Sequence, residues 1–301
     1  MIKIESISKS YDEVKALKSV SLEINKGELF GLIGPDGAGK TTLMRILMTL
    51  LKPDSGSAKM DKLDVVKDFK KIRRMVGYMP GRFSLYQDLS VEENLNFFAT
   101  VFGTTVQENI DTIRDIYYQI EPFKTRRAGD LSGGMKQKLA LSCALIHKPK
   151  ILVLDEPTTG VDAVSRKEFW DMLKKLQKKD ITIMVSTPYM DEAGLCDRVA
   201  LIQNGNILDV DSPGQITEKF PRKIIRVRSD DMFRLINDLR AYEKAETVFA
   251  FGEFVHFTGL HDKVETKELD SYLESKTHSN IVVEEIAPEI EDVFMNLMEK
   301  T

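Results

Sequence analysis

The chain has 301 residues, which at about 150 residues per domain is enough for about two domains. Hydrophobic residues make up 42% of the chain and charged residues 30%, so the composition excludes wholesale disorder. Lysine and arginine together number 43 against 47 acidic residues, a net charge of −4, which argues against a dedicated nucleic-acid-binding protein.

Hydropathy and the first residues bear on whether the chain is a membrane-spanning, secreted or lipid-anchored protein. No apolar run of the sequence approaches the roughly 20 residues that a membrane-spanning helix needs. The first residues carry neither the apolar core of a signal peptide nor a glycine for myristoylation. We therefore expect a soluble, cytoplasmic protein; if it works at a membrane, another chain supplies the spanning part. The two cysteines, Cys143 and Cys196, are interpreted as buried free thiols.

The amino-terminal part is predicted to consist of short strands around a glycine-rich loop. The expected strands span residues 6–11, 17–24, 28–33, 57–65 (as a pair) and 76–79. A helix is expected from about 39 to 50, ending before the turn at Pro53.

From Ser90 to about 147 the pattern becomes helical. Ser90 and Glu93 form a capping box that predicts a helix start. Two continuous apolar runs, 151–154 and 181–185, are typical of buried parallel strands. Helical stretches are expected at 163–178 and 189–196, and a hairpin at 199–210 around Asn204-Gly205.

A domain boundary is expected between residues 212 and 221, which gives a first domain over 1–215 and an accessory domain over 222–301. The accessory domain shows the order β-α-β-β-α-β, which predicts a small α+β ferredoxin-like fold. A last amphipathic helix follows from about Ile290. His256 lies in a strand of this domain and is interpreted as a packing or surface residue, because no second metal ligand stands at a useful spacing.

One loop carries the strongest chemical signal. It fits the pattern G-x-x-x-x-G-K-[ST], follows an expected strand and opens an expected helix. Its residues are Gly34, Pro35, Asp36, Gly37, Ala38, Gly39, Lys40 and Thr41. The glycines let backbone N–H groups approach phosphate oxygens, and the helix N-terminus favours the same charge. The motif assigns Lys40 to the β and γ phosphates of a nucleotide, and the Thr41 hydroxyl to Mg²⁺.

An acidic pair ends the apolar run 151–154. Asp155 is placed to hold Mg²⁺, directly or through water, and Glu156 to polarise a water as the catalytic residue. Such a run is a weak signal alone, because many buried strands end in Asp. Together with the phosphate loop upstream it predicts a nucleotide-hydrolysing site.

Further segments resemble the ATP-binding subunit of an ABC transporter. Residues 131–135 match the family signature LSGGQ in four of five positions, and 155–157 match its Walker B ending. Residues 160–162 resemble the D-loop, and Tyr11 stands where the family has an aromatic residue that stacks on adenine. The resemblance runs over about residues 1–215.

The resemblance implies an α/β fold of the P-loop NTPase class, an ABC-type cassette. Such a cassette has a mixed core sheet, an antiparallel edge sheet and a helical subdomain, here at about 85–147. It also implies an ABC-type ATPase that uses ATP and Mg²⁺, with ATP contacts from Tyr11, the phosphate loop and Thr42.

The same resemblance implies a head-to-tail dimer with a second ATP-binding subunit, identical or different. ATP would lie between one subunit's phosphate loop and the other subunit's signature. The residues implied to contact the partner's ATP are Ser132, Gly133, Gly134 and Asp162.

Two stretches, 186–199 and 288–294, resemble the drug- and polysaccharide-export branch of the family. Subunits of that branch pair with a separate ABC-2-type membrane permease. The resemblance thus implies a peripheral location on the cytoplasmic face of the inner or plasma membrane, with 90–127 contacting the permease.

Two positions depart from the family pattern. The family has G-Y-x-P-Q where this chain has Gly81 in place of the glutamine, and S-T-H where it has Pro188 in place of the histidine. Gln87 would replace the missing glutamine only if its loop folded back. Losing one preorganised donor typically costs about 100- to 1000-fold in rate. We therefore expect intact ATP binding, slow hydrolysis at the chain's own site, and an asymmetric heterodimer.

Two alternatives remain open. One is a soluble, non-transport ABC protein that acts in translation, although such proteins usually carry two cassettes in one chain. The other is a nucleotide-gated regulator without significant hydrolysis.

Overall fold

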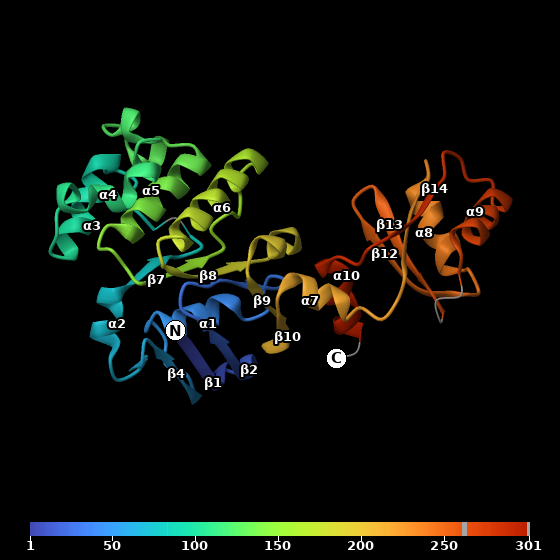
Figure 1. Ribbon diagram of the computed structural model, residues 1–301, viewed down its shortest axis with the longest axis horizontal. Coiled ribbons are helices and arrows are strands. Elements are labelled where there is room, and N and C mark those ends of the chain that lie inside the picture. The colour runs from blue at the N-terminus through green and yellow to red at the C-terminus, as the bar shows by residue number, and fades with distance from the viewer. Residues whose placement is uncertain (83, 261–263, 300–301) are drawn as a thin grey trace. The chain divides into compact units, whose positions relative to one another are not determined.

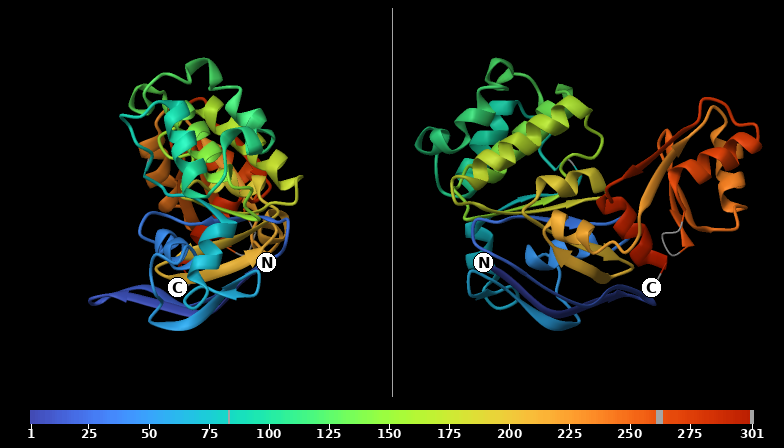
Figure 2. Two further views of the ribbon diagram at one scale, coloured as in Figure 1. Left: turned by 90° about the vertical axis from the view of Figure 1, so that its left-hand side faces the viewer. Right: turned by 45° about the vertical axis from the view of Figure 1, so that its right-hand side comes forward.

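The computed structural model describes residues 1–82, 84–260 and 264–299 and divides the chain into two compact units, Met1–Pro213 and Gly214–Thr301. Figures 1 and 2 show the first unit in blue to yellow and the second in orange to red. Over the described ranges, none of the helices combines the length and the apolar character that a bilayer-spanning helix requires.

The first unit is built on a six-stranded mixed sheet in the order β10-β9-β3-β8-β7-β6. Its strands are β3 (Leu29–Ile33), β6 (Val76–Met79), β7 (Ile151–Asp155), β8 (Thr182–Thr187), β9 (Arg198–Gln203) and β10 (Asn206–Asp211). Neighbours pair in parallel except β9 and β10, which form the predicted hairpin. β3, β7 and β8 are buried throughout, as expected for parallel strands covered on both faces.

A second, antiparallel sheet has the order β2-β1-β4-β5. Its strands are β1 (Ile2–Tyr11), β2 (Val14–Ile24), β4 (Ser55–Met60) and β5 (Leu63–Asp64). Helix α1 (Lys40–Leu47) lies between this sheet and the core sheet (Figures 1 and 2). Leu43 and Met44 of α1 share one apolar core with Ile4 of β1 and Leu32 of β3. This core fixes where α1 begins, and with it the phosphate loop.

Helices cover the other side of the core sheet (Figure 1). They are α3 (Val91–Val101), α4 (Val106–Tyr117), α5 (Gly133–Leu145) and α6 (Ala163–Gln177), with 3₁₀ turns at Glu121–Phe123 and Ala128–Asp130. The predicted capping box is confirmed, since Ser90 and Glu93 bond each other's backbone N–H groups. Thr105 and Glu108 form a second capping box at α4.

Two elements differ from the sequence prediction. Helix α2 (Phe69–Met75) was not predicted; it has seven residues and no side-chain cap, so it carries little sequence signal. The stretch 189–196, predicted to be helical, contains only a 3₁₀ helix at Met190–Leu195. Cys196 lies directly after that helix, and both cysteines are free and buried. Burial raises the pKa of the Cys196 thiol to about 12.

The second unit has the ferredoxin-like arrangement. After α7 (Pro213–Glu218), its elements are β11 (Ile224–Arg228), α8 (Met232–Arg240), β12 (Ala245–Phe251), β13 (Phe254–Gly259), α9 (Thr266–Ser275), β14 (Val282–Ile286) and α10 (Ile290–Glu299). The sheet order is β12-β13-β11-β14, with antiparallel neighbours. Helices α8 and α9 lie on one face of this sheet and α10 on the other (Figures 1 and 2).

The close packing of β6 against α5 gives a stability prediction. A Cβ atom at Gly77 would lie 2.4 Å from the backbone oxygen of Ala144, so Gly77→Ala should destabilise the first unit by about 1–3 kcal/mol. Denaturant unfolding followed by the fluorescence of Trp170, the only tryptophan of the chain, measures this.

Gly194→Ala is the matched control, because a Cβ at Gly194 would meet no heavy atom within 4 Å. Equal unfolding midpoints for the two variants would contradict the packing argument.

Candidate functional site

The phosphate loop, residues 34–39, joins β3 to α1 and is held by close backbone contacts. Gly37 and Gly39 have φ values of +79° and +108°, which favour glycine. A Cβ at Gly39 would lie 2.5 Å from the backbone oxygen of Ala16, and one at Gly34 would lie 2.1 Å from that of Ile202. The loop backbone therefore lies directly against β2 and β9, where side chains would not fit.

Lys40 is the buried cation of this loop, with 3% of its surface exposed. Its Nζ donates to the backbone oxygens of Gly34 (2.7 Å) and Pro35 (3.0 Å). The same atom lies 3.1 Å from Glu156 Oε1 and 4.0 Å from Asp36 Oδ1. These contacts hold the ammonium group at the centre of the loop, facing Glu156.

Asp155 ends β7 and is 2% exposed. Two hydroxyl groups donate to its Oδ1: Thr41 Oγ1 at 3.2 Å and Ser186 Oγ at 2.6 Å. The predicted metal-ligating pair, Thr41 and Asp155, is thus brought together by α1 and β7. Ser186 was not predicted, although a polar residue at the end of a parallel strand beside β7 is a signal for such a contact.

Glu156 follows in the left-handed region, with a φ of +50°. Its backbone N–H donates to the hydroxyl and the carbonyl oxygen of Ser186, both at 3.0 Å. This anchoring directs the Glu156 side chain, which is 23% exposed, towards Lys40. A strained backbone conformation held by neighbouring hydrogen bonds is typical of functional positions.

A cavity of about 630 Å³ opens beside the two acids. Its polar and charged lining residues are Thr41, Arg45, Tyr78, Arg82, Asp155 and Glu156. Arg45 and Arg82, two cations that line the same cavity as the acidic pair, were not predicted from the sequence. Burial, together with the charge of Asp155, raises the pKa of Tyr78 to about 12, so Tyr78 remains a neutral hydroxyl at neutral pH.

These residues fit a nucleotide with Mg²⁺. The cradle at Gly34 and Gly39 excludes side chains, which leaves backbone N–H groups to face phosphate oxygens. The Thr41 hydroxyl and the Asp155 carboxylate supply the oxygen ligands that Mg²⁺ prefers. Lys40 adds one buried positive charge for the phosphates.

Gly81 and Pro188, the two positions that depart from the family pattern, lie close to the acidic pair and the phosphate loop. A Cβ at Gly81 would lie 3.0 Å from the backbone oxygen of Asp155 and 3.8 Å from Glu156 Cβ, so position 81 faces the acids without a side chain. Pro188 follows Thr187, whose carbonyl oxygen accepts from the N–H of Gly34 at 3.3 Å. Gln87 is held elsewhere: its backbone oxygen accepts from Gly129 at 2.9 Å, and it does not line the cavity.

The predicted trans residues form a separate cluster at two helix N-termini. Ser132 caps α5 by accepting from Met135 N at 3.3 Å, and Asp162 caps α6 by accepting from Ser165 N at 3.0 Å. That hydrogen bond lowers the pKa of the Asp162 carboxyl. A Cβ at Gly134 would lie 2.6 Å from Ser165 Oγ, so the two helix starts touch. Ser132 and Gly133 are exposed.

The remaining predicted ATP contacts flank the loop. Tyr11 ends β1, pairs with Val14 across the hairpin and is 41% exposed. The same β1–β2 hairpin carries Ala16, which contacts the loop at Gly39. Thr42 lies in the first turn of α1 and is half-buried. In the described part of the chain no hydrogen bond or ring contact ties Tyr11 to the loop, so its adenine contact stays a prediction.

Fold and site together define a P-loop cassette: a mixed core sheet, a phosphate loop before α1, an acidic pair after β7 and an antiparallel edge sheet. Comparison with known proteins agrees. A family profile described as ABC transporter matches residues 17–159. The solved dimer of the ATP-binding cassette MJ0796 bound to ADP and Pi is similar, with a TM-score of 0.64 and 27% identity over 70% of this chain and 98% of that one.

Two curated relatives extend this likeness. The probable multidrug ABC transporter ATP-binding protein YbhF of Escherichia coli is 45% identical over 67% of this chain. The Nod factor export ATP-binding protein I of Burkholderia thailandensis is 34% identical over 83% of this chain and 85% of its own length. The chain therefore belongs to the family of ABC transporter ATP-binding proteins. It spans 36% of the length of the Escherichia coli relative.

The position of Lys40 gives a binding prediction. Lys40→Gln should weaken ATP binding by about 10- to 100-fold, because charge-assisted hydrogen bonds contribute about 1.5–3 kcal/mol. Titration with a fluorescent ATP analogue in the presence of Mg²⁺ measures this loss. Lys26→Gln is the matched control: it removes the same charge from an exposed residue outside the phosphate loop, and binding should be unchanged. Unchanged affinity in Lys40→Gln would contradict the assigned role.

Proposed function

We propose that this chain is the ATP-binding subunit of an ABC exporter. It binds ATP with Mg²⁺ at a head-to-tail interface with a second ATP-binding subunit and drives a separate membrane permease of the ABC-2 type. The observation that carries the proposal is the convergence of Lys40, Thr41, Asp155 and Glu156 at one phosphate loop. The relatives named for multidrug transport and Nod factor export support the exporter branch.

Different residues of the chain are proposed to bind the phosphates, to hold Mg²⁺ and to activate the attacking water. Lys40 and the loop N–H groups bind the phosphates. Thr41 and Asp155 would hold Mg²⁺, which would neutralise phosphate charge. Glu156, anchored through Ser186, is the group that orients and polarises the attacking water. Its present partner is Lys40 at 3.1 Å, so Glu156 is available for this role once Lys40 turns to a phosphate oxygen.

The second cluster suits contact with a partner's ATP. Ser132 and Gly133 are exposed at the N-terminus of α5, a helix of 13 residues. Free N–H groups and the positive end of the helix dipole favour phosphate there. Asp162 begins α6 beside them. A head-to-tail dimer lets this surface complete the partner's site, and the dimeric MJ0796 cassette supports such an assembly.

The chain's own site is proposed to hydrolyse ATP slowly. Gly81 offers no side chain towards Asp155 and Glu156. Pro188 has no side-chain donor, and the neighbouring Thr187 hydroxyl already donates to Glu192 at 2.5 Å. With Ser132, Gly133 and Gly134 of the signature present and two donors missing, the chain fits the less active half of a heterodimer.

Restoring the two missing side chains tests this. The purified chain should show slow steady-state ATPase activity, and Gly81→Gln with Pro188→His should raise it by about 100-fold or more. The gain should disappear when Glu156→Gln is added, which controls for contaminating activity. Position 81 accepts a side chain after a shift of a few tenths of an ångström, because the closest atom lies 3.0 Å from its Cβ.

Robust, Glu156-dependent turnover by the unaltered homodimer would contradict the asymmetric assignment. ATP binding without turnover in either form of the chain would favour a non-hydrolytic regulator instead.

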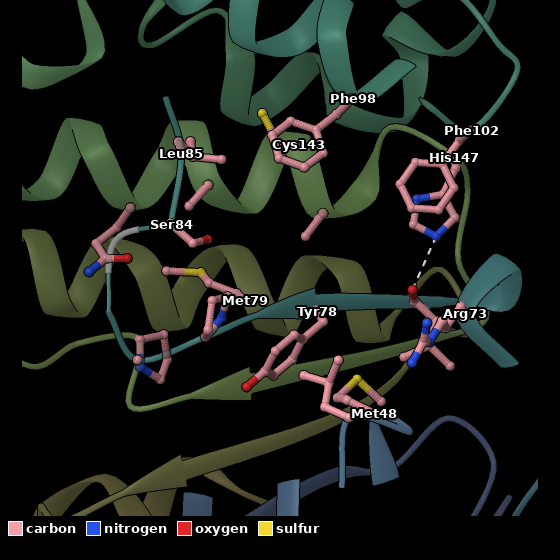
Figure 3. Close-up of a pocket in the computed structure, with 18 of the residues that line it drawn as sticks. Met48, Arg73, Tyr78, Met79, Ser84, Leu85, Phe98, Phe102, Cys143 and His147 are labelled. Carbon is pink, nitrogen blue, oxygen red and sulfur yellow. Dashed lines mark hydrogen bonds between the residues drawn. The ribbon is translucent and has the colours of Figure 1, made fainter. Parts of the chain in front are cut away.

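The proposed permease contact is an apolar surface around a cavity of about 300 Å³. Figure 3 shows its side chains, with Phe98, Phe102 and Cys143 from the helices facing Tyr78 and Met79 of β6. Phe102 stacks on His147 at 3.8 Å between ring centroids, and His147 Nε2 bonds the oxygen of Val76 at 3.2 Å.

Large apolar side chains are exposed near this cavity. They are Leu50 (57% exposed), Tyr86 (50%), Phe97 (40%) and Val101 (61%). Tyr86 and Phe97 contact each other edge to face, with ring centroids 4.8 Å apart. Clustered exposed apolar residues mark interaction surfaces. Tyr86, Phe97 and Val101 lie on α3 and the loop before it, and Leu50 follows α1 and lines the cavity. A permease bound here would hold the chain at the cytoplasmic face of a membrane.

A charge placed on this surface should remove the permease. Phe97→Asp with Val101→Asp should abolish recovery of a multi-span protein when the tagged chain is pulled down from detergent-solubilised membranes of the source organism. Phe233→Asp on α8 is the control, since Phe233 is 80% exposed on the second unit, and recovery should persist. Recovery of ribosomes in place of a multi-span protein would favour the soluble, non-transport alternative.

A further inference from the structure

The sheet of the second unit has one face that lies outside its apolar core. Val248, Val255 and Phe257 belong to the core that α8 and α9 complete. Because side chains alternate along a strand, their neighbours Thr247 and His256 face the opposite side, where α10 lies (Figure 1). That face carries polar side chains that the proposed function does not use.

A cavity of about 280 Å³ lies on this face, close to the lower end, about 300 Å³, of the usual range for small-molecule sites. Its polar lining includes His256, Thr247, Thr258, Arg222 and Glu246, and Phe249 lines it with an aromatic ring. All of these residues belong to the second unit.

His256 lines this cavity. It is 7% exposed, and its Nδ1 lies 2.7 Å from Asp292 Oδ1. Asp292 in turn accepts from Glu289 N at 2.8 Å. A carboxylate only accepts, so Nδ1 carries the proton, and in the tautomer with a single proton on Nδ1 the ring has a lone pair at Nε2. Within the described residues the bonding of His256 uses Nδ1 alone, which leaves Nε2 to accept from a ligand.

Two charges of opposite sign flank this acceptor. Arg222 binds Glu246 through two hydrogen bonds, of 2.6 and 3.0 Å. The pair is neutral as a unit, and the Asp292 carboxylate is directed at His256. A phosphate ester would meet two carboxylates and one arginine that is already engaged, so the lining disfavours a strong anion and favours a ligand that carries both charges.

The threonine pair adds a directed donor. Thr247 Oγ1 and Thr258 Oγ1 lie 2.7 Å apart, so one hydroxyl donates to the other and the second proton is left for an outside acceptor. Phe249, paired with His256 across the strands, gives the same cavity an apolar wall.

We propose that this cavity binds a free amino acid. The ligand's ammonium group donates to His256 Nε2 and Glu246, its carboxylate accepts from Arg222 and a threonine hydroxyl, and its side chain packs on Phe249.

Equilibrium binding to the full-length chain tests this. Each protein amino acid is titrated singly by isothermal calorimetry, with glucose and inorganic phosphate as ligands of different chemistry. At least one amino acid should bind, while glucose and phosphate should not. Thr247→Val with Thr258→Val keeps the shape and removes both hydroxyls together, so no buried group is left unpaired; binding should weaken at least tenfold.

A second variant separates a zwitterion from an uncharged ligand. Arg222→Gln with Glu246→Gln removes both charges of a pair that is about one-third exposed, and amino-acid binding should be lost. Ser271→Ala on α9, whose hydroxyl bonds Lys267 O, is the control and should bind normally. Failure of every amino acid to bind, binding of glucose or phosphate in their place, or wild-type affinity in both double variants would overturn the proposal.

Discussion

The buried carboxylate of Asp155 is the group on which the functional end of the first unit depends. A charge with 2% exposure needs hydrogen-bond partners, because burying an uncompensated charge is strongly unfavourable. Thr41 and Ser186 donate to the same carboxylate oxygen, so the start of α1 and the ends of β7 and β8 are tied at one atom. Ser186 also anchors the backbone of Glu156. The position of Glu156, the candidate catalytic residue, therefore depends on the same hydrogen bonds.

Much of the fold follows from short-range pattern. Continuous apolar runs predicted β7 and β8, Asn204-Gly205 predicted the β9–β10 hairpin, and Ser90 with Glu93 predicted the start of α3. Helix α2 was missed because a seven-residue helix without a cap has too few positions to show a period. The 3₁₀ helix at Met190–Leu195 was predicted as an ordinary helix because both share apolar spacing over so few residues.

In the candidate site, too, residues in local motifs were predicted and residues joined by long-range contacts were missed. The phosphate-loop motif and the acidic strand end are local, so Lys40, Thr41, Asp155 and Glu156 were named from sequence and lie together. Ser186 bonds a residue 31 positions away, and His256 bonds one 36 positions away on the last helix. Such contacts arise only when elements far apart in the sequence pack together. His256 is buried, as predicted for a packing residue, but its partner Asp292 carries no local signal.

The contact between the starts of α5 and α6 has a consequence for mutagenesis. A Cβ at Gly134 would lie 2.6 Å from Ser165 Oγ, so position 134 has to be glycine for packing as well as for any approach of phosphate. Lost activity in Gly134→Ala could therefore arise either from disturbed packing of the two helices or from a blocked approach of phosphate. Combining it with Ser165→Gly opens the space again, and a variant that stays inactive then assigns the loss to the backbone at Gly134, which is proposed to face a partner's nucleotide.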